Sequence, residues 1–167
     1  MIEADGEHSA LAAHAVRRAL AMGLRLGVAE SLTGGAVCVA LVEMPGASQV
    51  VRGAVVAYDA TLKESLLGVS AALLDGPGPV SAEVAQAMAS GVCEATGSDI
   101  GVATTGAAGP EPHGGKAPGT AFVAVCRGDE LLAVKELHLD GDRDAVTRGV
   151  VGAALAILGD TLDSLAA

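Results

Sequence analysis

Ser31 and, further along the chain, Tyr58 and Lys63 have the side-chain types needed for hydrolysis without a metal. A serine hydroxyl becomes a nucleophile when a base takes its proton, and a lysine amine can be that base only if its pKa is depressed. Each residue also has an ordinary explanation. Ser31 suits a helix N-cap, Lys63 an exposed helix position, and Tyr58 a strand end with a solvated hydroxyl. Residue types alone leave both interpretations open.

Polar and glycine-rich segments suggest where a ligand would bind. Ser31 precedes a predicted helix, whose N-terminal N–H groups could hold a developing oxyanion. The segment 105–109 (TGAAG) could cradle a ligand, because glycine permits close backbone approach. Arg143 and Arg148 lie near the start of the last predicted helix, where they could clamp a phosphate or pair with neighbouring aspartates.

Strands and helices that alternate along the chain must position these residues. Apolar runs predict strands over 24–29, 53–58, 99–104, 119–126 and 131–139, the last two forming a hairpin. Helical periodicity predicts helices over 8–22, 34–43, 82–96 and 142–165, with a short helix around Lys63. The pattern predicts a three-layer α/β/α fold with a mostly parallel sheet and a C-terminal hairpin. Ligands bind at the carboxyl ends of such strands, where 30–35, 58–63 and 104–109 fall.

Length and charge limit the number of domains and the partners. A chain of 167 residues predicts a single domain over 1–167. Ten basic against twenty acidic residues give a net charge of −10, and no basic stripe occurs, so nucleic acid is not an expected partner. The first five residues lack a basic start, and no uncharged apolar stretch of about 18 residues occurs. We therefore expect no signal peptide, no membrane span and a cytoplasmic protein.

The cysteines and histidines do not predict a metal site. Cys38, Cys93 and Cys126 are distant from one another and have apolar neighbours, so we expect buried, reduced thiols. The four histidines lack metal-ligand spacing, although His113 lies in a polar loop. No metal is expected.

Seven short motifs of this sequence follow one another in the order of a known family. The run 29–35 (AESLTGG) is similar to the signature AESCTGG, and 53–58 (GAVVAY) with the downstream Lys63 is similar to GGVVAYSNEAK. Further matches lie at 44–48, 80–85, 105–110, 118–120 and 141–143. Over nearly its whole length the chain thus resembles the CinA C-terminal domain family, the nicotinamide-nucleotide amidases.

The resemblance implies a stand-alone CinA C-terminal-like amidase domain that acts as a homodimer and needs no cofactor. Its expected reaction is removal of ammonia from the carboxamide of nicotinamide mononucleotide by a Ser–Lys mechanism, which yields nicotinic acid mononucleotide. Ser31 would be the nucleophile, Lys63 the general base, and Tyr58 a residue that relays or orients the proton. The implied substrate contacts are the backbone N–H groups of Thr33, Gly34 and Gly35, the pocket residues Thr105 and Gly106, and the side chain of Arg143.

Three departures from the family pattern leave alternatives open. Leu32 stands where the family usually has cysteine, Asp59-Ala60 replaces the usual Ser-Asn, and 111–113 (EPH) alters the loop after 105–110. The second change removes an amide that could bind substrate. A catalytically silent nucleotide-binding or regulatory domain, or an amidase for another carboxamide, is therefore also consistent with the sequence.

Overall fold

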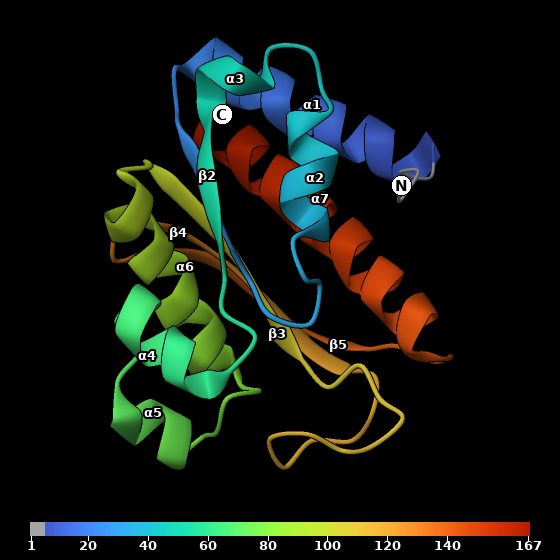
Figure 1. Cartoon of the computed structure of the whole chain (residues 1–167). Coiled ribbons are helices and arrows are strands. Elements are labelled where there is room, and N and C mark those ends of the chain that lie inside the picture. Colours follow the sequence, from blue (N-terminus) through green and yellow to red (C-terminus); the bar gives the residue numbers. More distant parts are fainter. Residues whose placement is uncertain (1–5) are drawn as a thin grey trace.

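Helices cover both faces of a five-stranded sheet in the computed structural model, which describes residues 6–167 (Figure 1). The strands are β1 (Leu26–Glu30), β2 (Val51–Val56), β3 (Ile100–Gly106), β4 (Thr120–Arg127) and β5 (Glu130–His138). Their order is β2-β1-β3-β4-β5. β1 is parallel to β2 and β3, whereas β4 is antiparallel to β3 and β5. Four of the described strands therefore share one direction, which confirms the mostly parallel sheet and its C-terminal hairpin.

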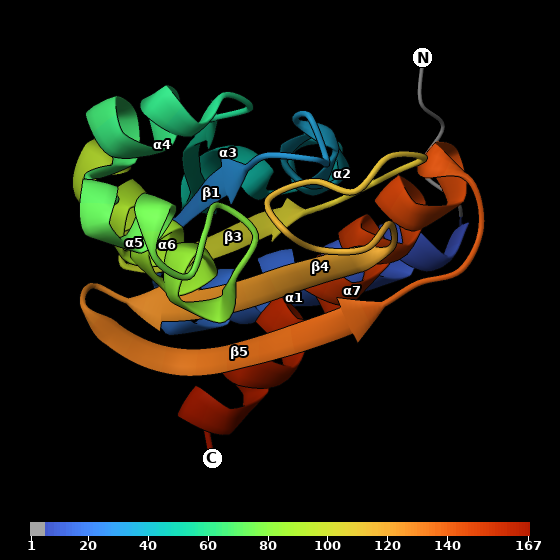
Figure 2. The same ribbon diagram turned by 90° about the horizontal axis from the view of Figure 1, so that it is seen from below.

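Two groups of helices form the outer layers (Figure 2). One face carries α1 (Gly6–Met22), α2 (Ala36–Val42) and α7 (Arg143–Leu165), with α3 (Ala47–Val50) beside α1. The other face carries α4 (Ala60–Leu67), α5 (Ala71–Asp75) and α6 (Ala82–Thr96). The predicted three-layer α/β/α architecture is confirmed.

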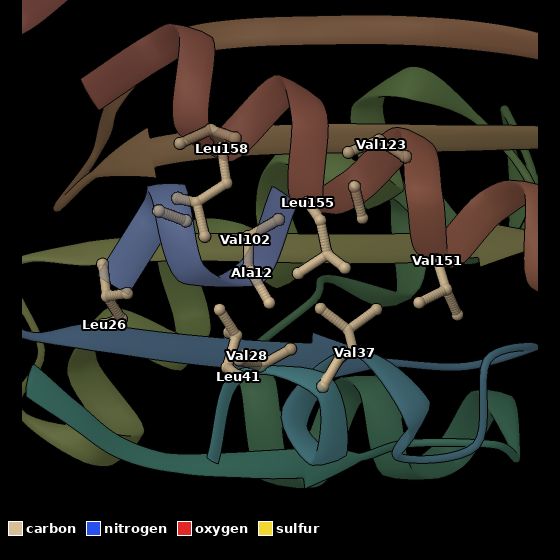
Figure 3. Close-up of a cluster of buried hydrophobic side chains, with 14 of the residues drawn as sticks. Ala12, Leu26, Val28, Val37, Leu41, Val102, Val123, Val151, Leu155 and Leu158 are labelled. Carbon is tan, nitrogen blue, oxygen red and sulfur yellow. The ribbon is translucent and has the colours of Figure 1, made fainter. Parts of the chain in front are cut away.

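Alternation along the central strands divides the core into two clusters. Val28 and Val102 face α1, α2 and α7 in the larger cluster (Figure 3). The next residue in each strand, Ala29 or Ala103, faces the α4 and α6 side. Because successive strand residues point to opposite faces, sequence position tells which layer each side chain contacts. Functional side chains on β1 and β3 follow the same rule.

The long helix α7 is a core helix in this fold. By length and composition it could cross a membrane, but half of its most apolar stretch is buried inside the structure. Val150, Leu155 and Leu158 are fully buried in the larger cluster, and α7 packs along α1. The globular core thus accounts for the apolar character of this helix.

The helix predicted over 34–43 needs correction, and the structure adds two short helices. Gly34 and Gly35 adopt left-handed φ angles of 60° and 102°, so α2 begins only at Ala36. The short helices α3 and α5 were not predicted, because four or five residues show no helical periodicity. A side-chain cap stabilises α5: the Ser70 hydroxyl accepts a hydrogen bond from the Leu73 N–H at 3.3 Å.

Close packing against α6 fixes α4, the helix that carries Lys63. Gly91 of α6 faces the carbonyl of Leu67, and a Cβ at residue 91 would overlap that oxygen. At the other end of α4, the Asp59 carboxylate caps the helix by accepting a hydrogen bond from the Thr61 N–H at 2.8 Å. Both ends of α4 are therefore held in place.

Replacing Gly91 by alanine is expected to push α4 away from α6. We expect Gly91→Ala to lower the free energy of unfolding by about 1–3 kcal/mol, as overpacking typically does, measured by urea denaturation. Gly6→Ala is the control, because a Cβ at Gly6 meets no atom within 4 Å. Equal stability of Gly91→Ala and the wild type would contradict the close approach of the two helices.

Candidate active site

A cavity of about 280 Å³ opens at the carboxyl ends of β1, β2 and β3. Four of the predicted site residues line it: Ser31, Tyr58, Gly106 and Arg143. Leu32 and the loop residues 108–113, which include Glu111 and His113, complete the lining. This is the edge at which an α/β sheet binds ligands, as the sequence predicted.

Arg143 ties three separate segments together at this cavity. Its Nη1 donates to the Gly109 carbonyl at 2.8 Å, and its Nη2 donates to the Tyr58 hydroxyl at 2.7 Å. Arg148 pairs instead with Asp144 at 3.0 Å, across one turn of α7. Of the two arginines considered as phosphate clamps, Arg143 is therefore the one that lines the cavity. The Tyr58 hydroxyl contacts Arg143 in this structure.

Lys63 is buried, so the exposed helix position considered for it is wrong. Lys63 is only 2% exposed. Its Nζ donates a hydrogen bond to Thr105 Oγ1 at 3.4 Å and contacts Met88 Sδ at 3.7 Å. Neither partner is charged, and none of the ion pairs within residues 6–167 involves Lys63. Burial lowers the pKa of Lys63 from 10.5 to about 8.

Thr105 orients the Lys63 amine. Its hydroxyl donates to the Pro79 carbonyl at 2.6 Å, so the threonine oxygen is left to accept from Nζ. A neutral amine that donates to Thr105 keeps its lone pair for another proton. Thr105 does not line the cavity, but the next residue does. Gly106 is needed there, because a Cβ would approach Ala121 Cβ to 2.7 Å.

Glu30 is a buried acidic residue that sequence analysis did not single out. Its carboxylate, fully buried, accepts hydrogen bonds from the Thr33 hydroxyl at 2.6 Å and from the N–H groups of Gly35, Val37 and Cys38 at 3.1, 3.1 and 2.9 Å. The available signal was a charged residue that ends the otherwise apolar strand 26–30. Glu30 therefore closes the loop that carries Ser31.

The start of α2 does not present the free N–H groups that the sequence suggested. Glu30 occupies several of them, the Gly35 N–H among them, and the Gly34 N–H donates to the Ser31 carbonyl at 3.1 Å. Of the three predicted backbone donors, only the Thr33 N–H has no hydrogen-bond partner within residues 6–167. Ser31 is not the N-cap of α2, since Gly35 is. Its hydroxyl is thus available at the cavity.

The thiols and the acidic and imidazole groups form no metal centre in the part of the chain that the structure describes. All three cysteines are free, Cys93 and Cys126 buried and Cys38 only half-buried, which corrects the expectation for Cys38. Burial raises the pKa of Cys126 to about 11, so this thiol stays protonated at neutral pH.

Comparison with known sequences finds relatives over most of the chain. The family model described as the CinA C-terminal domain matches residues 8–162. A protein of Desulforudis audaxviator, with the name of a competence-damage inducible protein, is 45% identical over 142 residues, which are 83% of this chain and 34% of that protein. The chain spans about a third of the length of the curated relatives it matches.

Solved structures share the fold closely. The competence/damage inducible protein CihA from Agrobacterium tumefaciens has a TM-score of 0.90 and 31% identity, over 96% of this chain and 99% of that one. A competence-damaged protein (CinA) superfamily protein from Klebsiella pneumoniae 700603 has a TM-score of 0.89 and 31% identity, over 94% and 98%.

Replacing Lys63 by methionine is expected to stabilise the fold at neutral pH. The folded-state pKa of about 8 lies below the ordinary 10.5, so the unfolded chain binds more protons between these values and stability rises with pH there. Below pH 8 the cost of the buried cation is fully present. We expect Lys63→Met to raise the free energy of unfolding by about 3 kcal/mol at pH 7 and by only about 1 kcal/mol at pH 10.

Chemical denaturation followed by circular dichroism at both pH values measures this effect. Lys135→Met, at an exposed position of β5, is the matched control and should change little at either pH. An equal gain at pH 7 and pH 10 for Lys63→Met would mean that the buried charge is not its source.

Proposed function

The chain belongs to the CinA C-terminal domain family, and from that premise we propose that it hydrolyses the carboxamide of nicotinamide mononucleotide to nicotinic acid mononucleotide and ammonia. One observation carries the proposal: Lys63 is buried with no ion-pair partner among residues 6–167, has a pKa lowered to about 8, and donates to Thr105, the neighbour of the cavity residue Gly106. A buried lysine of this kind can act as the base for a serine nucleophile.

The adjacent ends of β1 and β3 support a location of Ser31 and Lys63 in the same region of the site. β1 and β3 pair Ala29 with Ala103, and beyond this pair the Thr33 Oγ1 of the following loop lies 2.8 Å from Thr104 Oγ1. Ala29 faces the α4 side, and Thr105 accepts the hydrogen bond from Lys63. No hydrogen bond joins Ser31 to Lys63 among residues 6–167, so the proposed reaction requires Ser31 Oγ and Lys63 Nζ to approach each other when the substrate binds.

The proposed reaction proceeds in two steps. Ser31 Oγ attacks the carboxamide carbon while neutral Lys63 takes the hydroxyl proton, and the tetrahedral intermediate expels ammonia as Lys63 returns that proton to the leaving nitrogen. Water then attacks the acyl-serine while Lys63 takes a proton from it, and collapse of the second tetrahedral intermediate releases the carboxylic acid as Lys63 returns that proton to Ser31 Oγ. The Thr33 N–H is the candidate oxyanion donor, and Thr105 keeps the amine oriented.

One basic side chain at the cavity, Arg143, supports an anionic substrate, and Glu111 is the acidic residue of the same lining. With a net charge of −10, the chain can hold a phosphate only through local donors, and Arg143 provides a guanidinium at the cavity. Because that guanidinium contacts both Gly109 and Tyr58, binding a phosphate there would couple the loop 108–113 to Tyr58. The departure at Asp59 leaves this arrangement intact, since its carboxylate caps α4 and bonds to Thr61.

Ammonia release from nicotinamide mononucleotide tests the reaction and its nucleophile. The purified wild type is expected to release ammonia, and Ser31→Ala is expected to lose at least about 10³-fold in kcat, because the variant lacks the hydroxyl that forms the acyl intermediate. Ser48→Ala, at an exposed position of α3, is the matched control and should retain full activity. Full release by Ser31→Ala would remove the serine mechanism.

The same assay separates the two alternatives. Binding of the mononucleotide in calorimetry without turnover by the wild type would favour a silent nucleotide-binding or regulatory domain. Ammonia from another carboxamide, but none from nicotinamide mononucleotide, would assign the chain a different amide substrate.

The activity is expected to rise with pH through about 8. Lys63 must be neutral to accept the serine proton, and its pKa lies near that value, so kcat/KM should fall about tenfold for each pH unit below 7. Initial rates between pH 5.5 and 9.5 measure this dependence. A flat profile from pH 6 to 9 would argue against lysine as the base.

A further inference from the structure

We propose that Glu30 is a positioning residue, whose buried carboxylate holds Ser31 in its reactive place. The proposal deepens the proposed function, on which its catalytic part rests. Glu30 and Ser31 are consecutive, so a fixed Glu30 side chain constrains the Ser31 backbone on its N-terminal side. On the C-terminal side, the four donors that bind Glu30 all come from residues 33–38. The carboxylate therefore constrains the loop on both sides of Ser31.

A chain of hydroxyl groups connects this carboxylate to β3. The Thr33 hydroxyl donates its single proton to Glu30 at 2.6 Å, so in its 2.8 Å contact with Thr104 the donor must be Thr104. Thr104, fully buried at the end of β3, thus fixes Thr33, and Thr33 fixes Glu30. Thr105, the next residue of β3, holds Lys63. The nucleophile and its base are positioned from adjacent residues of one strand.

The donors satisfy a charge that no cation neutralises. None of the ion pairs among the described residues includes Glu30, and the side chain is 0% exposed. Hydrogen bonds to an ionised acceptor are about twice as strong as neutral ones, and N–H groups at a helix start favour negative charge. Such a set of bonds costs desolvation but specifies one loop geometry, which is what a nucleophile requires.

Glu30→Gln tests this role, because it keeps the side-chain shape but removes one acceptor atom and the charge. We expect kcat for ammonia release to fall by about 10²-fold with little change in KM, since displacement of a reacting group by about 1 Å costs that much. The rate of Ser31 labelling by a fluorophosphonate should fall in parallel. Glu43→Gln, an exposed acid just after α2, is the matched control and should behave as wild type.

Rates are compared per folded molecule, at a temperature at which circular dichroism shows each variant fully folded. A purely structural role would lower the melting temperature and leave both rates intact, and that result would overturn the proposal. If Glu30→Gln does not fold, the variants Thr33→Val and Thr33→Ser test the proposal instead. Thr33→Val lacks the hydroxyl that donates to Glu30, so the fluorophosphonate should label its Ser31 at least about tenfold more slowly than in Thr33→Ser. Equal labelling of these two variants would overturn it.

The labelling experiment distinguishes a failure of this inference from a failure of the proposed reaction. A wild type that labels at Ser31 but releases no ammonia from nicotinamide mononucleotide would defeat the proposed substrate alone. The comparison of Glu30→Gln with Glu43→Gln would still decide the role of Glu30. A wild type that does not label would show that Ser31 is not activated, and the positioning role would fall with it.

Discussion

The buried amine of Lys63 is the constraint on which the candidate site depends. No carboxylate compensates its charge within residues 6–167, and its contacts are a hydroxyl oxygen and a thioether sulfur. Such surroundings favour the neutral form of the amine, which is the form that can accept a proton. They also make the folded state less stable than it would be with an apolar side chain at this position. Stability and reactivity are thus opposed at a single residue.

Small residues make this burial possible. Gly91 lets α4 approach α6. Ala29 and Ala103, which face these helices from the sheet, have small side chains that let the helices lie close to the strands. A core rich in alanine, valine and glycine, with only 1% aromatic residues, allows helices to lie close to the strands. The long lysine side chain fills space that larger apolar residues occupy in other cores. Composition and site chemistry are therefore linked through packing distance.

Much of this arrangement could be predicted from the sequence, because it follows from periodicity and topology. Apolar runs separated by helical segments predict the α/β layers, and the carboxyl-end rule predicts that Ser31, Tyr58 and Gly106 share an edge. Their common cavity agrees with that rule. The capped helices α6 and α7 were predictable from Ser81 and Asp142, whose side chains accept N–H bonds as expected of N-caps.

The hydrogen-bond partners inside the site could not be predicted in this way. A local pattern cannot show that Glu30 turns back onto residues 33–38, because the turn depends on the left-handed angles of two glycines. Burial of Lys63 depends on the approach of two helices whose contact residues, 67 and 91, are far apart in the chain. Long-range packing decided both features, whereas secondary-structure propensity decided the elements.

The near absence of aromatic residues has a spectroscopic consequence. The chain has no tryptophan and one tyrosine, and that tyrosine stands at the cavity with its hydroxyl against the guanidinium of Arg143. Its ultraviolet emission is therefore a signal from one place in the molecule, free of background from any other indole or phenol. The fold therefore carries a single intrinsic fluorophore at the cavity, where its emission can report on ligand binding.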